Sequence, residues 1–121
     1  MRVILPNDDE FLRYQKSYYS GQQQDVEPSC RVLPDSAEEL SIALRLLNQY
    51  QIPYAVKAGG HSSIANASNI DSRGISIDLD SMTSLDFVNN KSSVLVGAGW
   101  RWGPLYAVSY THLTLPTIYS V

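Results

Sequence analysis

The most regular pattern of hydrophobic and polar positions lies between residues 36 and 53. Four apolar residues recur there at intervals of three and four positions: Leu40, Ala43, Leu44 and Leu47. This spacing puts them on one face of an α-helix. Ser36 and Glu39 fit a capping box, in which a hydroxyl and a carboxylate accept N–H groups of the first turn. Pro53 ends the helix within a few residues.

Short apolar runs on both sides of this helix predict strands. Arg31–Leu33 precedes it, Tyr54–Lys57 follows it, and Ile75–Leu79 alternates apolar and polar residues further along. A strand, a helix and a strand joined by short links form a βαβ unit. Its two strands run parallel, with a right-handed crossover.

The rest of the chain gives a weaker pattern. Ser84–Val88 and Ser93–Val96, separated by a turn at residues 89–91, predict an antiparallel hairpin. A helix is expected to begin near Trp102, and another to cover residues 8–20. The predicted fold class is α+β: a βαβ first subdomain followed by the start of a mainly antiparallel second subdomain.

Composition narrows the class of protein. The chain has 121 residues, enough for one small domain, and a formal net charge of −3 without any run of Lys or Arg. These features argue against a nucleic-acid partner. We expect no membrane association, because no apolar run is long enough to span a bilayer. Residues 1–10 lack the basic start of a signal peptide, and the single Cys30 cannot form an internal disulfide.

The loop that follows the second predicted strand is the main candidate site. Ligands of open α/β sheets bind beyond the carboxyl ends of strands. Gly59 and Gly60 permit positive φ and close approach of a ligand, and successive N–H groups can bind an anion such as a pyrophosphate. Lys57, Ser62 and Ser63 could add hydrogen-bond donors. The alternative is a tight glycine turn that carries a surface histidine, His61.

Other kinds of site find less support. The chain has neither a Gly-x-x-x-x-Gly-Lys-Ser/Thr phosphate loop nor a Gly-x-Gly-x-x-Gly after the first strand. A metal site would need partners for His61 and Cys30, so we expect none. A Ser–His–Asp triad of Ser62, His61 and either Asp71 or Asp78 requires a geometry that neighbours in one loop rarely provide.

Several motifs together resemble a known family. They are Pro28-Ser29-Cys30-Arg31-Val32, Lys57-Ala58-Gly59-Gly60-His61-Ser62, Asn69-Ile70-Asp71, Ile77-Asp78-Leu79 and Val96-Gly97-Ala98-Gly99 with Trp102-Gly103. In this order they resemble the PCMH-type FAD-binding domain of the vanillyl-alcohol-oxidase-like flavoproteins. The berberine-bridge-enzyme-like oxidoreductases are the nearest group. The resemblance covers roughly residues 11–107.

The resemblance implies a role for each residue of the loop. His61 matches the histidine that in many members is bonded through a ring nitrogen to the 8α-methyl carbon of FAD. Gly59, Gly60 and Ser62 match the loop that contacts the pyrophosphate. Lys57 stands where the family usually has an arginine. It keeps the charge but not the planar fork, so its phosphate contact stays open.

Further residues are expected to border the cofactor or to support it. Gly97 and Gly99 either end a strand that faces the cofactor or are plain turn glycines. Trp100 and Trp102 are expected to be packing aromatics. Secreted members carry a signal peptide and an earlier cysteine that would pair with Cys30. This sequence shows neither feature, so we expect either that Met1 is an internal start or that this member is intracellular and Cys30 stays reduced.

The resemblance also implies an activity for a longer enzyme. It would oxidise a small organic substrate by hydride transfer to the flavin, with dioxygen as the expected acceptor. The catalytic base and the substrate domain would lie beyond this chain, so the fragment alone is expected to be inactive. The alternatives are a dehydrogenase of the same superfamily with noncovalent flavin and a non-catalytic α/β module that binds an anion.

The final stretch differs in character from the rest. Residues 108–121 resemble the translation of a transposase-type sequencing adapter. We therefore expect residues 1–107 to be the truncated FAD-binding domain, and residues 108–121 to be a non-native tail without function.

Overall fold

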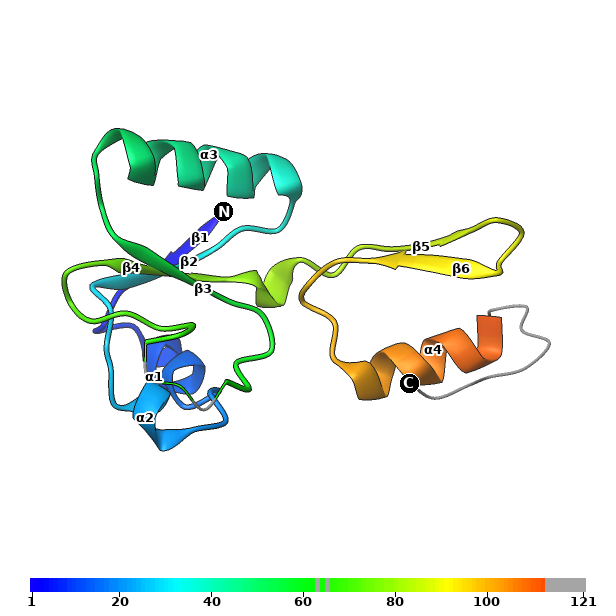
Figure 1. The fold of residues 1–121 in the computed structure, drawn as a ribbon, viewed down its shortest axis with the longest axis horizontal. Helices are drawn as coiled ribbons and strands as arrows, with labels where there is room; N and C mark the ends of the chain where they lie inside the picture. The colour runs from blue at the N-terminus through cyan, green and yellow to red at the C-terminus, as the bar shows by residue number, and fades with distance from the viewer. Residues whose placement is uncertain (63, 65, 113–121) are drawn as a thin grey trace.

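A four-stranded sheet with helices on both faces forms the larger part of the molecule. The computed structural model describes residues 1–62, 64 and 66–112. The strands are β1 (Arg2–Ile4), β2 (Cys30–Leu33), β3 (Tyr54–Lys57) and β4 (Ile75–Asp78), in the order β1-β2-β4-β3. Helix α3 (Ala37–Gln49) covers one face, and α1 (Asp9–Gln15) and α2 (Gly21–Gln24) cover the other (Figure 1).

The predicted βαβ unit is confirmed, with one strand inserted between its two strands. β2 and β3 both pair in parallel with β4, so they run in the same direction without touching, while β1 pairs antiparallel with β2. The Ser36 half of the capping box is also confirmed, because Ser36 Oγ accepts from Glu39 N at 3.2 Å. Ala43 and Leu47 of α3 are buried against the sheet. The apolar stripe thus binds the helix to the sheet.

The smaller part of the molecule follows the sheet. A short 3₁₀ turn, η1 (Leu79–Ser81), leads into the predicted hairpin of β5 (Leu85–Val88) and β6 (Ser93–Val96) and then into α4 (Trp102–His112) (Figure 1). The hairpin turn has positive φ at Asn89, Asn90 and Lys91. Asparagine tolerates this region better than most residues, which fits the turn predicted there. Helix α4 runs past residue 107, and residues 113–121 of the predicted tail lie outside the described residues.

The helix predicted over residues 8–20 is shorter than expected. α1 ends at Gln15, and Ser20 caps the separate helix α2 by accepting from Gln23 N at 3.4 Å. Between the helices, Tyr19 N donates to Gly60 O at 2.8 Å and the Tyr18 side chain is buried. Because of these tertiary contacts, the segment between the two helices interacts with distant residues and does not continue the helix.

Three charged side chains are buried near Tyr18: Arg31, Lys57 and Asp78. Lys57 and Asp78 are 1% and 0% exposed and form an ion pair at 3.3 Å. Arg31 is fully buried, and no carboxylate of a described residue pairs with it. Its guanidinium donates to Tyr18 Oη (3.1 Å), Ser76 Oγ (3.0 Å) and Gln15 Oε1. Neutral hydrogen-bond acceptors therefore take the place of a counter-charge for Arg31.

A buried carboxamide joins α2 to the loop that follows β3. Gln23 is fully buried, and its Nε2 donates to Ser62 O at 2.7 Å. Its Oε1 accepts from both the N–H and the hydroxyl of Ser68, at 2.8 and 2.9 Å. Asn69 Nδ2 donates to the Gln23 carbonyl at 2.8 Å. The polar, Gln-rich segment is thus the support of the candidate loop.

Replacing Gln23 tests this support. Gln23→Leu removes three side-chain hydrogen bonds and leaves the half-buried groups of Ser62 and Ser68 without these partners. We expect it to lower the free energy of unfolding by about 2–4 kcal/mol. The exposed neighbour Gln22 provides the matched control. Gln22→Leu should change stability by no more than about 0.5 kcal/mol in the same urea titration. Equal effects of the two variants would contradict the supporting role.

The buried ion pair predicts a second result. Asp78→Asn keeps an oxygen for Asp80 N, which donates to Asp78 Oδ1 at 3.0 Å, but leaves Lys57 without its counter-charge. We expect a loss of about 3–5 kcal/mol in the free energy of unfolding. The double variant with Lys57→Met should recover most of it, because no buried charge then remains at this pair. Urea unfolding of the four proteins gives the coupling directly. Additive losses would show that the pair is not coupled.

Candidate functional site

The loop at the carboxyl end of β3 has the positive φ that its glycines were predicted to permit, at Gly60 but not at Gly59. Gly60 is buried and has φ of +71°. A Cβ there would lie 2.9 Å from Lys57 Cε and 3.5 Å from the Tyr18 backbone. Gly59 is different, since a Cβ there would meet only His61 Cδ2, at 3.9 Å. Gly60 is therefore needed by the fold, whereas Gly59 leaves open space.

His61 stands at the exposed side of this loop. Its imidazole stacks on the ring of Tyr19, with centroids 5.2 Å apart and planes inclined by 10°. The loop carbonyl at Gly60 is held by Tyr19 N, as described above. Within the part of the chain that the structure describes, the N–H groups of Gly59, Gly60 and His61 meet no protein acceptor. The loop thus has an exposed imidazole and three backbone N–H groups that bond to no acceptor among the described residues.

A cavity of about 760 Å³ brings the loop together with the segment that leaves the hairpin. Its walls come from the loop after β3 and from β6 to α4: Ala58, Gly59, His61, Val96, Gly97, Ala98, Trp100, Arg101, Trp102 and Leu105. The volume is within the range of about 300–1,000 Å³ found for small-molecule and cofactor sites. The two predicted motifs, far apart in the chain, therefore border one cavity.

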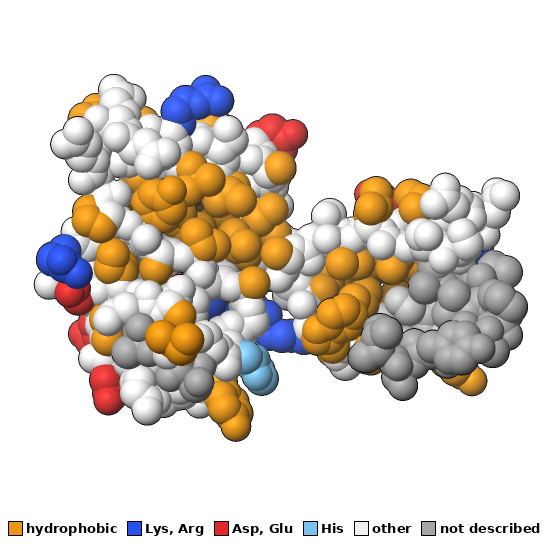
Figure 2. All heavy atoms as spheres, in the orientation of Figure 1, with side chains coloured by type: hydrophobic (Ala, Val, Ile, Leu, Met, Phe, Trp, Pro, Cys, Tyr) orange, Lys and Arg blue, Asp and Glu red, His pale blue; other side chains and the backbone are white. Residues whose placement is uncertain are grey.

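Arg101 connects the two sides of this cavity. One guanidinium nitrogen donates to Ala58 O at 3.2 Å, and the other lies 3.1 Å from Asp80 Oδ1. Figure 2 shows Lys or Arg side chains where the two parts of the molecule meet. Arg101 belongs to none of the motifs recognised in the sequence. Its only signal is its place two residues after Gly99, and its partners are distant in sequence.

The predicted site residues divide into those the cavity brings together and those it does not. Gly59, His61 and Gly97 line it. Ser62 is bound through its carbonyl to Gln23, and its Oγ accepts from Ile64 N at 3.2 Å. Ser63 lies outside the described residues. Lys57 is buried, with its ammonium directed to Asp78 and 5.4 Å from the centre of the Tyr18 ring.

Gly97 and Gly99 both lie where the chain passes against the η1 turn. A Cβ on Gly97 would be 2.2 Å from Met82 O, and one on Gly99 would be 2.6 Å from Asp80 O. Their N–H groups donate to Ser84 O and Met82 O, each at 2.9 Å. Close backbone contact therefore explains why glycine occupies both positions, and Gly97 also faces the cavity.

The two tryptophans have different environments. Trp100 Nε1 donates to the carbonyls of Thr83 and Ser84, at 3.1 Å each, which agrees with the predicted packing role. Trp102 is 69% exposed and stacks on Tyr106, with centroids 5.6 Å apart. Trp102 thus packs on a neighbouring ring at the surface and not in the core, and both tryptophans line the cavity.

The two carboxylates considered for a Ser–His–Asp triad are both paired with basic side chains. Asp71 accepts from Arg73 Nε at 2.8 Å, and this contact lowers the pKa of the Asp71 carboxyl. Asp78 is paired with Lys57. Among the described residues, no three His, Cys, Asp or Glu side chains lie close enough to hold a metal ion. Burial raises the pKa of the Cys30 thiol, which disfavours the reactive thiolate.

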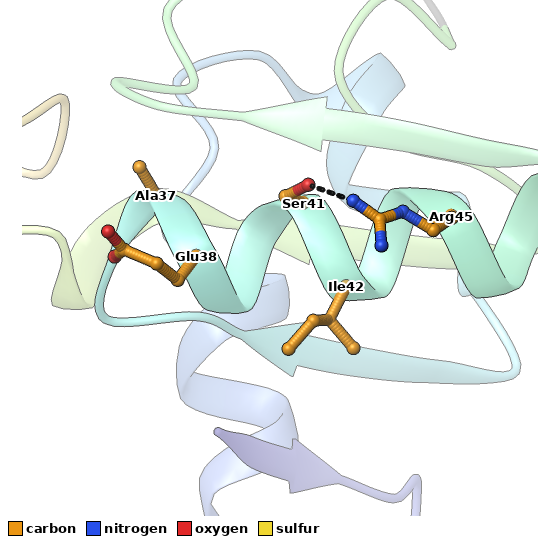
Figure 3. A pocket seen from close by; sticks show the side chains of 5 residues that line it. All are labelled: Ala37, Glu38, Ser41, Ile42 and Arg45. Carbon is orange, nitrogen blue, oxygen red and sulfur yellow. Dashed lines mark hydrogen bonds between the residues drawn. The ribbon is translucent and has the colours of Figure 1, made fainter.

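A depression of about 400 Å³ on the outer face of α3 is lined by residues of that helix alone: Ala37, Glu38, Ser41, Ile42 and Arg45 (Figure 3). None of the five is buried, so this depression is a shallow gap between exposed side chains of a single helix. None of the described helices is long and apolar enough to cross a membrane.

Comparisons with known proteins identify relatives of the sequence. The family described as "FAD binding domain" matches residues 28–118, past the tail boundary predicted at residue 108, which stays a prediction. FAD-dependent monooxygenase sdcF of Emericella nidulans is 31% identical over 107 residues, covering 87% of this chain and 22% of that protein. Oligopeptidase PhomG' of Diaporthe leptostromiformis is 38% identical over 120 residues, covering 94% of this chain and 10% of that protein.

Solved structures share the fold. 6-Hydroxy-D-nicotine oxidase from Arthrobacter nicotinovorans superposes with a TM-score of 0.75 and 25% identity, covering 91% of this chain and 23% of its own. BBE-like 1 of Physcomitrella patens gives a TM-score of 0.75 at 21% identity, with the same coverage. The chain spans less than a quarter of each of these relatives. It therefore belongs to the FAD-binding domain family and has the fold of part of such a domain, of the kind seen in berberine-bridge-enzyme-like proteins.

Proposed function

We propose that this chain is the cofactor-anchoring part of an FAD-dependent oxidoreductase, and that His61 is the covalent attachment point of the flavin. The observation that carries the proposal is the position of the His61 imidazole on the wall of the 760 Å³ cavity, next to Gly59. The match to the FAD-binding domain family supports FAD as the ligand of this cavity.

The loop fits the diphosphate part of such a cofactor. The N–H groups of Gly59, Gly60 and His61, free of acceptors in the described protein, form a set of donors suited to an anion. Gly59 has room for close approach, because a Cβ there would meet only one side-chain atom within 4 Å. Lys57 is buried and engaged with Asp78, so its contribution to this site is electrostatic and not a direct phosphate contact.

The attachment balances as a two-electron oxidation. A bond would form between an unprotonated imidazole nitrogen of His61 and the 8α carbon of FAD; the 8α carbon would lose one hydrogen and the other ring nitrogen would lose its proton. Dioxygen accepts both hydrogens and leaves as hydrogen peroxide. A neutral imidazole is a competent nucleophile for this bond. The role of the chain is to hold this ring at the cavity wall.

The activity belongs to the longer enzyme. When bound, FAD supplies a hydride acceptor, and the enzyme oxidises a small organic substrate with dioxygen as the terminal acceptor. Curated relatives are named FAD-dependent monooxygenases, and a structural neighbour is named an oxidase. We place substrate binding and the catalytic base in the remainder of such an enzyme. The residues described here hold and orient the cofactor.

Substitution of His61 tests the attachment. In the full-length protein expressed with ample riboflavin, flavin should remain with the acid-precipitated wild-type polypeptide. With His61→Ala it should move to the supernatant, while FAD still binds before precipitation. Cys30→Ala removes the only thiol of this chain and should leave the flavin in the pellet. Flavin released from the wild type would identify the noncovalent alternative. A protein that takes up no FAD would favour the anion-binding module.

The two loop glycines give a matched pair of variants. Gly60→Ala should lower the free energy of unfolding by about 2 kcal/mol, because alanine is disfavoured at positive φ. Gly59→Ala has open space and should change the stability of the FAD-free protein by less than about 0.5 kcal/mol. It should nevertheless weaken FAD binding by about tenfold, or ~1.4 kcal/mol, where a ligand approaches this backbone. Unfolding and FAD titration separate the effects, and unchanged FAD affinity of Gly59→Ala would contradict the proposed diphosphate contact.

A further inference from the structure

Two adjacent tyrosines have opposite environments. Tyr18 is 2% exposed, its hydroxyl donates to Ser68 O at 2.8 Å, and Arg31 donates to the same hydroxyl at 3.1 Å. Tyr19 is 72% exposed, and its ring stacks on His61. Tyr18 therefore contributes to the core. Burial does not explain why an aromatic residue occupies position 19.

The position of Tyr19 is fixed by its backbone. Its N–H donates to Gly60 O at 2.8 Å, which joins it to the residue just before His61. On one side, the buried Tyr18 holds the chain against the sheet. On the other, Ser20 caps α2 by accepting from Gln23 N. The Tyr19 ring is thus held beside the loop although most of its surface is exposed.

Stacking restricts the imidazole in a particular way. With planes inclined by only 10° and centroids 5.2 Å apart, the Tyr19 ring lies along one face of His61 in an offset stack. Both ring nitrogens carry their lone pair or proton in the ring plane, so the edge that reacts stays open. Rotation about the Cβ–Cγ bond would break the stack, and such aromatic contacts contribute beyond the area they bury. The contact therefore favours one plane of the imidazole.

We propose that Tyr19 is a positioning residue for His61, whose stacked ring holds the imidazole with its edge toward the cavity for bond formation with the flavin. This inference rests on the covalent attachment proposed above. It concerns the aromatic ring and not the hydroxyl, because the stack is made by the ring face. Tyr19 acts through His61 and takes no part in the chemistry itself.

The test compares the rate of covalent incorporation in the full-length protein, prepared without flavin and then mixed with FAD. Flavin in the acid pellet is followed over time. Tyr19→Phe keeps the stacked ring and should react within about twofold of the wild-type rate. Tyr19→Leu removes the ring and should react about fivefold more slowly, the size expected for loss of one aromatic pair. Tyr50→Ala, at another exposed tyrosine, is the control and should react as the wild type does.

Two further measurements separate positioning from a general structural effect. Noncovalent FAD affinity, measured in a His61→Ala background, should be the same with and without the Tyr19→Leu substitution. The His61 ring protons in the flavin-free protein should lose their ring-current shift in Tyr19→Leu and keep it in Tyr19→Phe. A purely structural role for Tyr19 would change the affinity and would not be rescued by phenylalanine.

The outcomes are distinct. If Tyr19→Leu incorporates flavin at the wild-type rate, or if Tyr19→Phe is as slow as Tyr19→Leu, the positioning role of the ring is overturned while the attachment proposal stands. If the wild-type protein itself never retains flavin in the acid pellet, the attachment proposal fails, and the role of Tyr19 toward that bond fails with it.

Discussion

The side-chain amide of Gln23 is the contact on which the geometry of the loop depends. It lies between α2 and the loop after β3, and it bonds to Ser62 on one side and Ser68 on the other. A buried amide with both ends engaged fixes direction as well as distance, because its donor and acceptor cannot be exchanged without loss. The loop carrying His61 is therefore held by a polar core, and its accessible face is left for a ligand.

The same region concentrates buried positive charge. Arg31 and Lys57 are buried close to Tyr18, with guanidinium carbon and ammonium 5.3 and 5.4 Å from the centre of its ring. Asp78 is the one carboxylate paired with either of them in the described residues. The remaining buried positive charge is stabilised by the face of the Tyr18 ring and by uncharged oxygen acceptors. Arg31, Lys57 and Asp78 together carry one net positive charge, which favours an anion at the proposed site.

Local signals predicted much of this architecture. The spacing of Leu40, Ala43, Leu44 and Leu47 identified α3, and the alternation after residue 75 identified β4, because both are set by neighbouring residues alone. The insertion of β4 between β2 and β3 depends on pairing between distant segments. The Tyr- and Gln-rich start of the chain was the least predictable part. Its Gln23 and Tyr19 contact residues 39 or more positions away, and no periodicity reports such contacts.

The close passage of Gly97 and Gly99 against η1 limits how this cavity can vary. Main-chain atoms meet there with no space for a β-carbon, so the junction between the sheet and the hairpin has no side chain that substitution could enlarge or shrink. Divergence in the shape of the cavity must then come from its other walls, Ala98, Trp100 and Trp102 among them. Homologous proteins that bind different ligands in this cavity should therefore differ at these wall positions. The positions of Gly97 and Gly99 should remain glycine.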